Sequence, residues 1–268
     1  MLPSRQIPVS NNYFRDEWAL NLGDTDEYID AGDWTEVIQG DFMVSMWIYL
    51  EDGRPSSEAT FFGAVIDSDN KYDFSITTGG ALKISVEFDG VSAEETLLHS
   101  QWTNSDYHKW RHILISHNQS AGDWSQIFKI SINGSSILQM DTNHTADERA
   151  LADFSSQNFY IGGRNNAGTF DKRLGLHRIS EVAVYKDTFE STSYISGIAS
   201  EMINNRTQYN HAEGIRKDKL WAWWRFGDGT EQGKGNKIYD MSGNGNHATA
   251  VNTDDTNYRY LDSAKYGI

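Results

Sequence analysis

Hydrophobic and polar residues alternate in short runs along most of this chain, and a period of two is typical of β-strands that face a core. In the run over residues 41–50, every second residue from Phe42 to Leu50 is apolar, while Trp47 and Tyr49 fall on the opposite face. Both faces of this strand are therefore predicted to be covered. Similar runs predict strands at 72–76, 82–88, 110–117, 128–132, 159–163, 179–185 and 220–226.

Turn-forming pairs separate several of these runs. A Gly-Gly pair at 79–80 and an Asp-Gly pair at 89–90 follow two of them. Asn133 and Gly134, the preferred pair of a type I′ hairpin turn, follow the run at 128–132. Many short strands joined by tight turns predict an all-β sandwich or barrel.

One segment, 191–203, has a helical period instead. Apolar residues recur at every fourth position in Tyr194, Ile198 and Met202, with further apolar residues beside them. This spacing predicts a helix of about three turns whose apolar stripe packs on a sheet or on a neighbouring molecule. The segment contains no Lys or Arg, which a lipid-binding amphipathic helix carries on its polar face.

Composition narrows the class of protein. The chain has 268 residues, a length at which all-β sandwiches fold as one unit, and nine of the residues are Trp. Cysteine is absent, so the fold depends on packing and contains no disulfide or thiolate site. The first residues lack the apolar stretch of a signal peptide, and no later stretch is apolar enough to span a membrane.

The charge balance is strongly acidic, with 38 Asp and Glu against 23 Lys and Arg, a formal net charge of −15. No stretch gathers basic residues into a stripe. Because nucleic-acid binding requires basic groups that neutralise phosphates, the sequence disfavours a nucleic-acid partner, and the same charge disfavours an anionic membrane surface.

The order of the predicted strands resembles that of the laminin-G-like modules of the concanavalin A-like superfamily. The segment 42–48 is similar to the family's "FTISMWV" strand, and 160–163 matches its "IGG" strand. The resemblance covers roughly residues 18–250 and implies a two-sheet antiparallel jelly-roll sandwich with one peripheral helix. The other segments that carry it are 19–29, 110–115 with 130–134, and 175–185.

This resemblance suggests a division of the chain into four parts. They are an irregular N-terminal arm at 1–17, the sandwich at 18–188, a helix and connector at 189–216, and a C-terminal segment at 217–268. In many members of the family a segment like 223–226 with 240–247 opens the module, whereas here it comes last. We therefore expect residues 217–250 to fold back onto the same sandwich, since the termini of a sandwich are often close together.

Catalytic signatures are weak. Glucanases with this fold carry a strand with a Glu-x-Asp-x-Glu pattern, in which two carboxyl groups cleave the glycosidic bond. The nearest match, Glu87 with Asp89, lacks the third carboxylate, and Asp89 followed by Gly90 is typical of a turn. The eight His residues show no zinc-site spacing. The sequence therefore predicts a protein that is not an enzyme.

Calcium is the best candidate for a metal cofactor. Asp67, Asp69 and Asp73 place three carboxylates in one predicted loop, and Ca²⁺ prefers oxygen ligands. The resemblance also implies a calcium site at the rim of the sandwich. The loop lacks the glycine and final glutamate of an EF-hand, and a solvated turn explains the same residues.

Three aromatic residues in polar segments, Trp102, Tyr107 and Trp124, are the candidates for contact with a glycan or a partner protein. An aromatic ring can stack on a sugar ring, and burial in a subunit interface explains the same residues equally well. Trp47 and Trp110, in contrast, are predicted to lie in the core, as is Trp224.

The late Trp-Trp-Arg-Phe segment at 223–226 resembles versions of this module in bacteriophage virion proteins. It implies a structural protein of the virion, either a capsid decoration or a tail-associated protein, made in the host cytoplasm and homo-oligomeric on the particle. Such a protein would dock on other virion proteins through its N-terminal arm and the helix at 191–203, and could also contact glycans. The alternatives are a calcium-assisted lectin and, third, a glycoside hydrolase.

Overall fold

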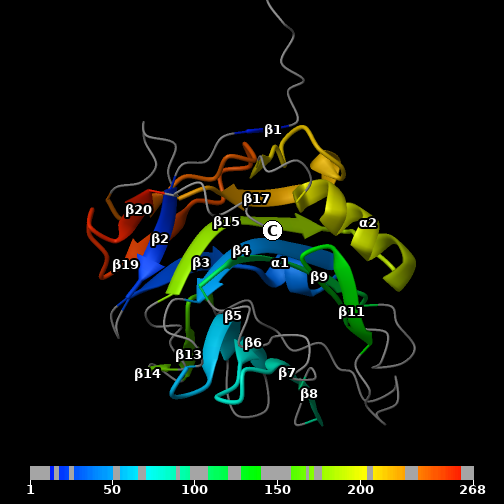
Figure 1. Ribbon diagram of the computed structural model, residues 1–268, viewed down its shortest axis with the longest axis horizontal. Coiled ribbons are helices and arrows are strands. Elements are labelled where there is room, and N and C mark those ends of the chain that lie inside the picture. Colours follow the sequence, from blue (N-terminus) through cyan, green and yellow to red (C-terminus); the bar gives the residue numbers. More distant parts are fainter. Residues whose placement is uncertain are drawn as a thin grey trace, which may run out of the picture.

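Two antiparallel sheets packed face to face form the protein, as the computed structural model in Figure 1 shows. The structure describes residues 13–14, 18–23, 27–50, 55–65, 71–88, 91–96, 108–119, 128–139, 158–166, 169–171, 177–203, 208–226 and 235–260. The predicted all-β sandwich of the jelly-roll type, with one peripheral helix, is confirmed.

The first sheet, called sheet I, has eight strands within the described residues. Its order is β11 (Ser135–Gln139), β10 (Phe128–Ile132), β9 (Trp110–His117), β4 (Phe42–Leu50), β15 (His177–Lys186), β2 (Trp18–Leu22) and β20 (Tyr258–Tyr260), with β17 (Leu220–Trp224) also paired to β15.

In the same described part of the chain the second sheet, sheet II, also has eight strands, and two short ribbons lie outside both sheets. The order of sheet II is β18 (Lys237–Ile238), β19 (Ala248–Val251), β3 (Tyr28–Asp33), β12 (Asn158–Ile161), β5 (Ala59–Val65), β6 (Lys71–Ile76), β7 (Leu82–Phe88) and β8 (Val91–Thr96). The ribbons are β1 (Tyr13–Phe14) with β16 (Gln208–Tyr209), and β13 (Arg164–Asn166) with β14 (Thr169–Asp171).

The main core lies between the two sheets. Val44 and Ile48 of β4 point into it and join aromatic residues of sheet II such as Phe62 and Phe74. Trp47, on the opposite face of β4, is only 4% exposed. Both faces of this strand are therefore covered, as the alternation predicted, and Trp110 and Trp224 are buried as well.

Helix α2 (Thr192–Ile203) covers part of the outer face of sheet I (Figure 1). Its buried side chains, Ile195, Ile198, Ala199 and Met202, follow the i, i+3, i+4, i+7 spacing of one helical face. Tyr194 was predicted to belong to this stripe, and that is wrong, since it is 68% exposed. At 3.6 residues per turn Tyr194 lies about 100° around the helix from Ile195 and points away from the sheet.

The C-terminal segment contributes strands to both sheets. β17 pairs with Val182 to Tyr185 of β15, and β2 pairs with the preceding residues of the same strand. In sheet II, β19 pairs with β3. Strands β17 and β19 of this segment are thus part of the sandwich.

Two residues of the predicted arm, Tyr13 and Phe14, form β1, and β1 pairs with β16 of the connector. The remainder of the arm lies outside the described residues. No helix in the described part of the chain is long and apolar enough to cross a membrane.

Candidate functional site

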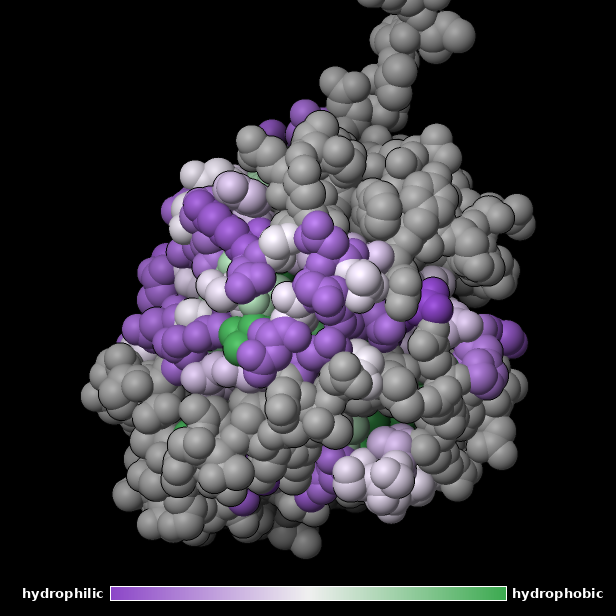
Figure 2. Space-filling model, turned by 90° about the vertical axis from the view of Figure 1, so that its left-hand side faces the viewer, coloured by the Kyte–Doolittle hydropathy of each residue, from purple (hydrophilic) through white to green (hydrophobic). Residues whose placement is uncertain are grey.

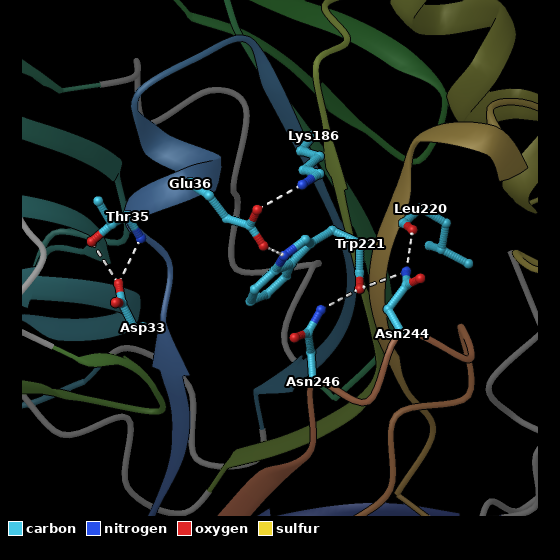
Figure 3. Close-up of polar contacts among 8 residues, drawn as sticks. All are labelled: Asp33, Thr35, Glu36, Lys186, Leu220, Trp221, Asn244 and Asn246. Carbon is cyan, nitrogen blue, oxygen red and sulfur yellow. Dashed lines mark hydrogen bonds and ion pairs between the residues drawn. The ribbon is translucent and has the colours of Figure 1, made fainter.

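A pocket of about 300 Å³ opens where α1 (Thr35–Ile38), the end of β15, the start of β17 and the loop at 240–246 meet. Figure 3 shows six of its residues. The lining consists of Glu36, Lys186, Asp187, Asp218, Lys219, Leu220, Trp221, Asn244 and Asn246. Segments from both ends of the chain therefore build one polar site.

Trp221 sits at the floor of the site because β17 is irregular at this residue. Leu220 pairs with Tyr185 and Ala222 pairs with Val184, so Trp221 is an extra residue with no partner position on β15. A β-bulge of this kind turns a side chain away from the regular alternation. In an unbroken strand Trp221 and Trp223 would share one face. Here Trp221 joins the main core, whereas Trp223 packs toward α2.

The bulge brings the indole of Trp221 to Glu36. Trp221 Nε1 donates a hydrogen bond to Glu36 Oε1 at 2.5 Å, and Lys186 Nζ donates to Glu36 Oε2 at 2.7 Å (Figure 3). The hydrogen bond from Lys186, reinforced by that from Trp221, holds the pKa of Glu36 below its ordinary value, against the opposing effect of partial burial. Glu36 is therefore an anion at neutral pH.

Short-range contacts fix the helix that carries Glu36. Asp33 Oδ1 accepts hydrogen bonds from the backbone N–H of Thr35 at 2.7 Å and from its hydroxyl at 2.6 Å. Trp34, between these residues, is fully buried and donates from Nε1 to the Ala31 carbonyl. The start of α1 is therefore anchored both at the surface and in the core.

The loop at 240–246, called the clasp, holds β17 through alternate side chains. Asp240 is its centre: Oδ1 accepts from the backbone N–H groups of Trp223 at 2.9 Å and Ser242 at 2.8 Å. Oδ2 accepts from the Ser242 hydroxyl at 2.7 Å and from the backbone N–H of Asn246 at 3.0 Å. One nearly buried carboxylate thus satisfies four donors.

The two asparagines of the clasp bind the backbone of β17 directly. Asn244 Nδ2 donates to the carbonyl oxygens of Leu220 at 2.8 Å and Trp221 at 3.1 Å. Asn246 Nδ2 donates to the same Trp221 carbonyl at 2.7 Å (Figure 3). The bulged carbonyl, which has no regular ladder partner, is satisfied in this way.

Removing the carboxylate of the clasp is expected to loosen this end of the sandwich. Asp240→Ala should lower the free energy of unfolding by about 2–3 kcal/mol, because four donors lose a charged acceptor. Denaturant unfolding measures the change. Asp255→Ala is the control, since Asp255 is an exposed acceptor for one backbone N–H, of Gly235; an equal loss in both variants would contradict the role given to Asp240.

Several polar atoms that line the pocket have no hydrogen-bond or ion-pair partner among the described residues. Asp187, Asp218 and Lys219 make no side-chain hydrogen bond or ion pair with any other described residue. Asn244 and Asn246 use their N–H groups on β17, and within the described part of the chain nothing donates to their side-chain oxygens. Such groups are available to a ligand.

A family profile described as the concanavalin A-like lectin/glucanases superfamily matches residues 23–193. This match covers more than half of the chain. The protein belongs to the concanavalin A-like lectin/glucanase superfamily. No curated protein sequence matches it.

Solved structures similar to this superfamily member include a heptameric pentraxin from Limulus polyphemus, with 14% identity, a TM-score of 0.48, and coverage of 75% of this chain and 85% of the pentraxin. A carbohydrate-binding module (CBM40) of a Ruminococcus gnavus sialidase has 12% identity and a TM-score of 0.46, covering 68% of this chain and 96% of the module. The NanB sialidase of Streptococcus pneumoniae has 12% identity and a TM-score of 0.48, covering 69% of this chain and 28% of the sialidase.

The aromatic residues predicted to contact a glycan or a partner, Trp102, Tyr107 and Trp124, all lie outside the described residues. The same is true of Asp67 and Asp69. For Glu87, the structure describes its place in β7 but not its side chain. The roles predicted for all of these residues therefore remain predictions.

Asp73, the third residue of the predicted calcium loop, is fully buried in β6. Its Oδ1 accepts from the Thr60 hydroxyl at 2.7 Å, and its Oδ2 forms an ion pair with Arg164 at 2.8 Å. One oxygen therefore contacts the neighbouring strand β5 of sheet II, and the other contacts the β13–β14 ribbon. Among the described residues, no group of three or more His, Asp or Glu side chains is placed to hold a metal ion.

Sequence reasoning did not single out Glu36, Lys186 or the clasp asparagines as a site. The clasp motif was visible only through its resemblance to the family. Its alternating Asp, Ser, Asn and Asn side chains were a usable signal, since such residues commonly bind nearby backbone groups. Nothing in the sequence showed that Glu36, roughly 200 residues earlier, would face the same loop.

Proposed function

We propose that this protein is a non-catalytic carbohydrate-binding module, with the pocket between α1, β15, β17 and the clasp as its binding site. The observation that carries this proposal is the pocket itself, in which carboxylate, ammonium and amide groups converge on one hollow. Sugar hydroxyls both donate and accept hydrogen bonds, so a mixed polar lining suits them. Membership of a superfamily of lectins and glucanases supports a carbohydrate ligand.

The electrostatics of Glu36 favour binding over hydrolysis. Glycoside hydrolases need a carboxylic acid that stays protonated near neutral pH, which requires a raised pKa. Glu36, the carboxyl group held most firmly in the pocket, has a lowered pKa instead. It is suited to fixing Lys186 and Trp221 in place rather than to donating a proton to a leaving group.

A glycan array followed by calorimetry with the best-bound glycan tests the proposal. The double variant Asp218→Ala with Lys219→Ala is expected to weaken binding about tenfold, because it removes two groups that a ligand can bind. Both side chains are solvent-accessible, so the fold should be unaffected.

Lys217→Ala is the matched control, because Lys217 lies in the same short 3₁₀ helix (Lys217–Lys219) but does not line the pocket. Its affinity should equal that of the unmodified protein. A flat array, or the same loss of affinity in the Lys217 variant, would reject the site.

Repeating the titration with a chelator tests calcium assistance. If calcium assists binding, the chelator should abolish it.

A structural role in a virion is a second proposal, supported by the resemblance of the segment at 223–226 to bacteriophage virion proteins. A glycan-binding pocket on a particle surface is compatible with that role. The described surface offers little apolar area for docking: its exposed large hydrophobic residues are Tyr194 and Met241, and the face in Figure 2 is mainly hydrophilic where it is coloured. The virion role would be rejected if mass spectrometry of purified particles did not detect this protein.

A further inference from the structure

We propose that the pocket selects sugars that carry an amine and discriminates against sugars that carry a carboxylate or sulfate. This inference rests on the proposed carbohydrate-binding function and names the class of ligand. Its basis is that some polar groups of the pocket already bind other residues of the protein, whereas others remain for a ligand.

Two charged groups of the pocket, Glu36 and Lys186, already pair with each other, so their charges cancel. Glu36 and Lys186 form an ion pair at 2.7 Å, and Glu36 also accepts from the indole of Trp221. Neither oxygen of Glu36 is without a donor, and the ammonium of Lys186 already has an anionic partner. This pair therefore contributes little net charge to a ligand.

The groups that remain are mostly acceptors. Asp187 and Asp218 supply two carboxylates, and Asn244 and Asn246 supply two amide oxygens whose N–H groups are turned to β17. Lys219 is the one cation with no partner among the described lining residues. A ligand must therefore bring donors, which hydroxyl and ammonium groups supply and carboxylates do not.

Stacking does not replace these polar contacts. Trp221 is only 5% exposed, and its ring packs edge-on against Trp34 and Trp224, with centroids 6.0 and 6.5 Å away. Among the described lining residues, no broad aromatic face is left for a sugar ring. Polar and charged groups therefore decide which sugar is bound.

The electrostatic field of the whole protein acts in the same direction. With two carboxylates against one ammonium among the free groups, the pocket is negative, and the chain as a whole carries −15. A negative pocket raises the local concentration of cations and lowers that of anions. In an open, hydrated pocket we expect each charge difference to change the affinity by about tenfold at low salt.

Calorimetric titration with three trisaccharides of equal length tests the inference. The probes are trimers of glucosamine, of N-acetylglucosamine and of galacturonic acid, at about pH 6, where a simple amine is protonated. The expected order of affinity is glucosamine, then N-acetylglucosamine, then galacturonic acid, with about tenfold between neighbours. The spacing should shrink as salt is added.

The double variant Asp187→Asn with Asp218→Asn removes both free negative charges and keeps the shape of the side chains. Asp187 has a φ of 53°, and asparagine tolerates this left-handed conformation, so the variant should fold normally. Because Lys219 is then the free charge that remains, the preference for the glucosamine trimer is expected to be lost or to reverse towards the galacturonic acid trimer. Glu213→Gln, an exposed acidic residue outside the pocket, is the control and should keep the order.

Three outcomes overturn the inference. They are a galacturonic acid trimer that binds as tightly as the glucosamine trimer, equal affinity for the amine and its N-acetyl form, and a preference that survives in the Asp187 and Asp218 variant. In each case the carbohydrate-binding function itself stands. Failure of all three trimers together with a flat glycan array would instead reject the proposed function, and the inference with it.

Discussion

Replacing His211 by alanine is expected to lower the free energy of unfolding by about 2–4 kcal/mol, because it removes one partner from each of two buried polar groups, Glu181 and Tyr185. His211 Nε2 lies 2.9 Å from Glu181 Oε1, and both side chains are 2% exposed. Its other ring nitrogen, Nδ1, is hydrogen-bonded to the Tyr185 hydroxyl. The imidazole therefore links two polar groups buried on the outer face of sheet I.

The direction of the hydrogen bond between Tyr185 and His211 follows from the protonation of the Tyr185 hydroxyl. Burial, followed by the nearby Tyr209, Glu181 and Glu201, raises the pKa of Tyr185 well above its ordinary value, so its hydroxyl stays protonated. The hydroxyl then donates to Nδ1, which leaves the proton of a neutral imidazole on Nε2, the nitrogen that lies 2.9 Å from Glu181 Oε1. Loss of the ring removes one polar partner from each neighbour in a region of low dielectric constant.

Chemical denaturation of His211→Ala, Glu181→Ala and the double variant forms a cycle that measures this coupling. The double variant should be less destabilised than the sum of the single variants by about 1–3 kcal/mol, because the contact between the two side chains can be lost only once. Additive losses would show that His211 and Glu181 act independently and would contradict the account.

Glu181→Gly adds a separate measurement of backbone strain. Glu181 has a φ of 56° at a bulge in β15, where Ser180 pairs with Trp47 and Val182 with Met46. A residue with a Cβ atom in this conformation costs about 1–2 kcal/mol relative to glycine. The glycine variant should therefore be about 1 kcal/mol more stable than Glu181→Ala.

Trp34→Ala is expected to cause a similarly large loss, about 3–5 kcal/mol, through the cavity that it leaves in the main core. Trp34 is fully buried, stacks on Phe159 with ring centroids 4.7 Å apart, and lies 6.2 Å from Trp224. It also stands immediately before α1, which carries Glu36. The variant should therefore weaken glycan binding as well as stability.

Two control variants separate the loss of core packing from the general effect of truncating an aromatic side chain. Trp34→Phe keeps an aromatic ring against Phe159 and should recover most of the stability. Tyr194→Ala truncates an aromatic residue that is 68% exposed and should change stability by no more than about 0.5 kcal/mol. If Trp34→Ala unfolded at the same denaturant concentration as Tyr194→Ala, the central position of Trp34 in the core would be wrong.

The irregular positions of the sheet explain where sequence-based prediction succeeded and where it failed. Along β4 and β9 the alternation runs unbroken, and Trp47 and Trp110 are buried as predicted. At Glu181 and Trp221 one extra residue enters the strand and shifts every later side chain to the other face. Neither position differs in residue type from an ordinary strand residue, so the sequence pattern gave no warning.

By itself, the sequence determined the properties that depend on neighbours along the chain. The period of two specified the strands and their buried faces, the i, i+3, i+4 spacing specified α2, and the order of motifs specified the two-sheet sandwich. These signals are local, because the backbone repeat dictates which side chains share a face.

Only the tertiary structure decided which polar groups meet. Glu36 faces Lys186 and Trp221 across separations of 150 and 185 residues, and His211 meets a glutamate placed by a bulge. The same packing turned Asp73, a candidate metal ligand, into the buried partner of Arg164. Such pairings depend on the register between strands and on the desolvation of each charge, and both are set by the whole fold rather than by any one segment.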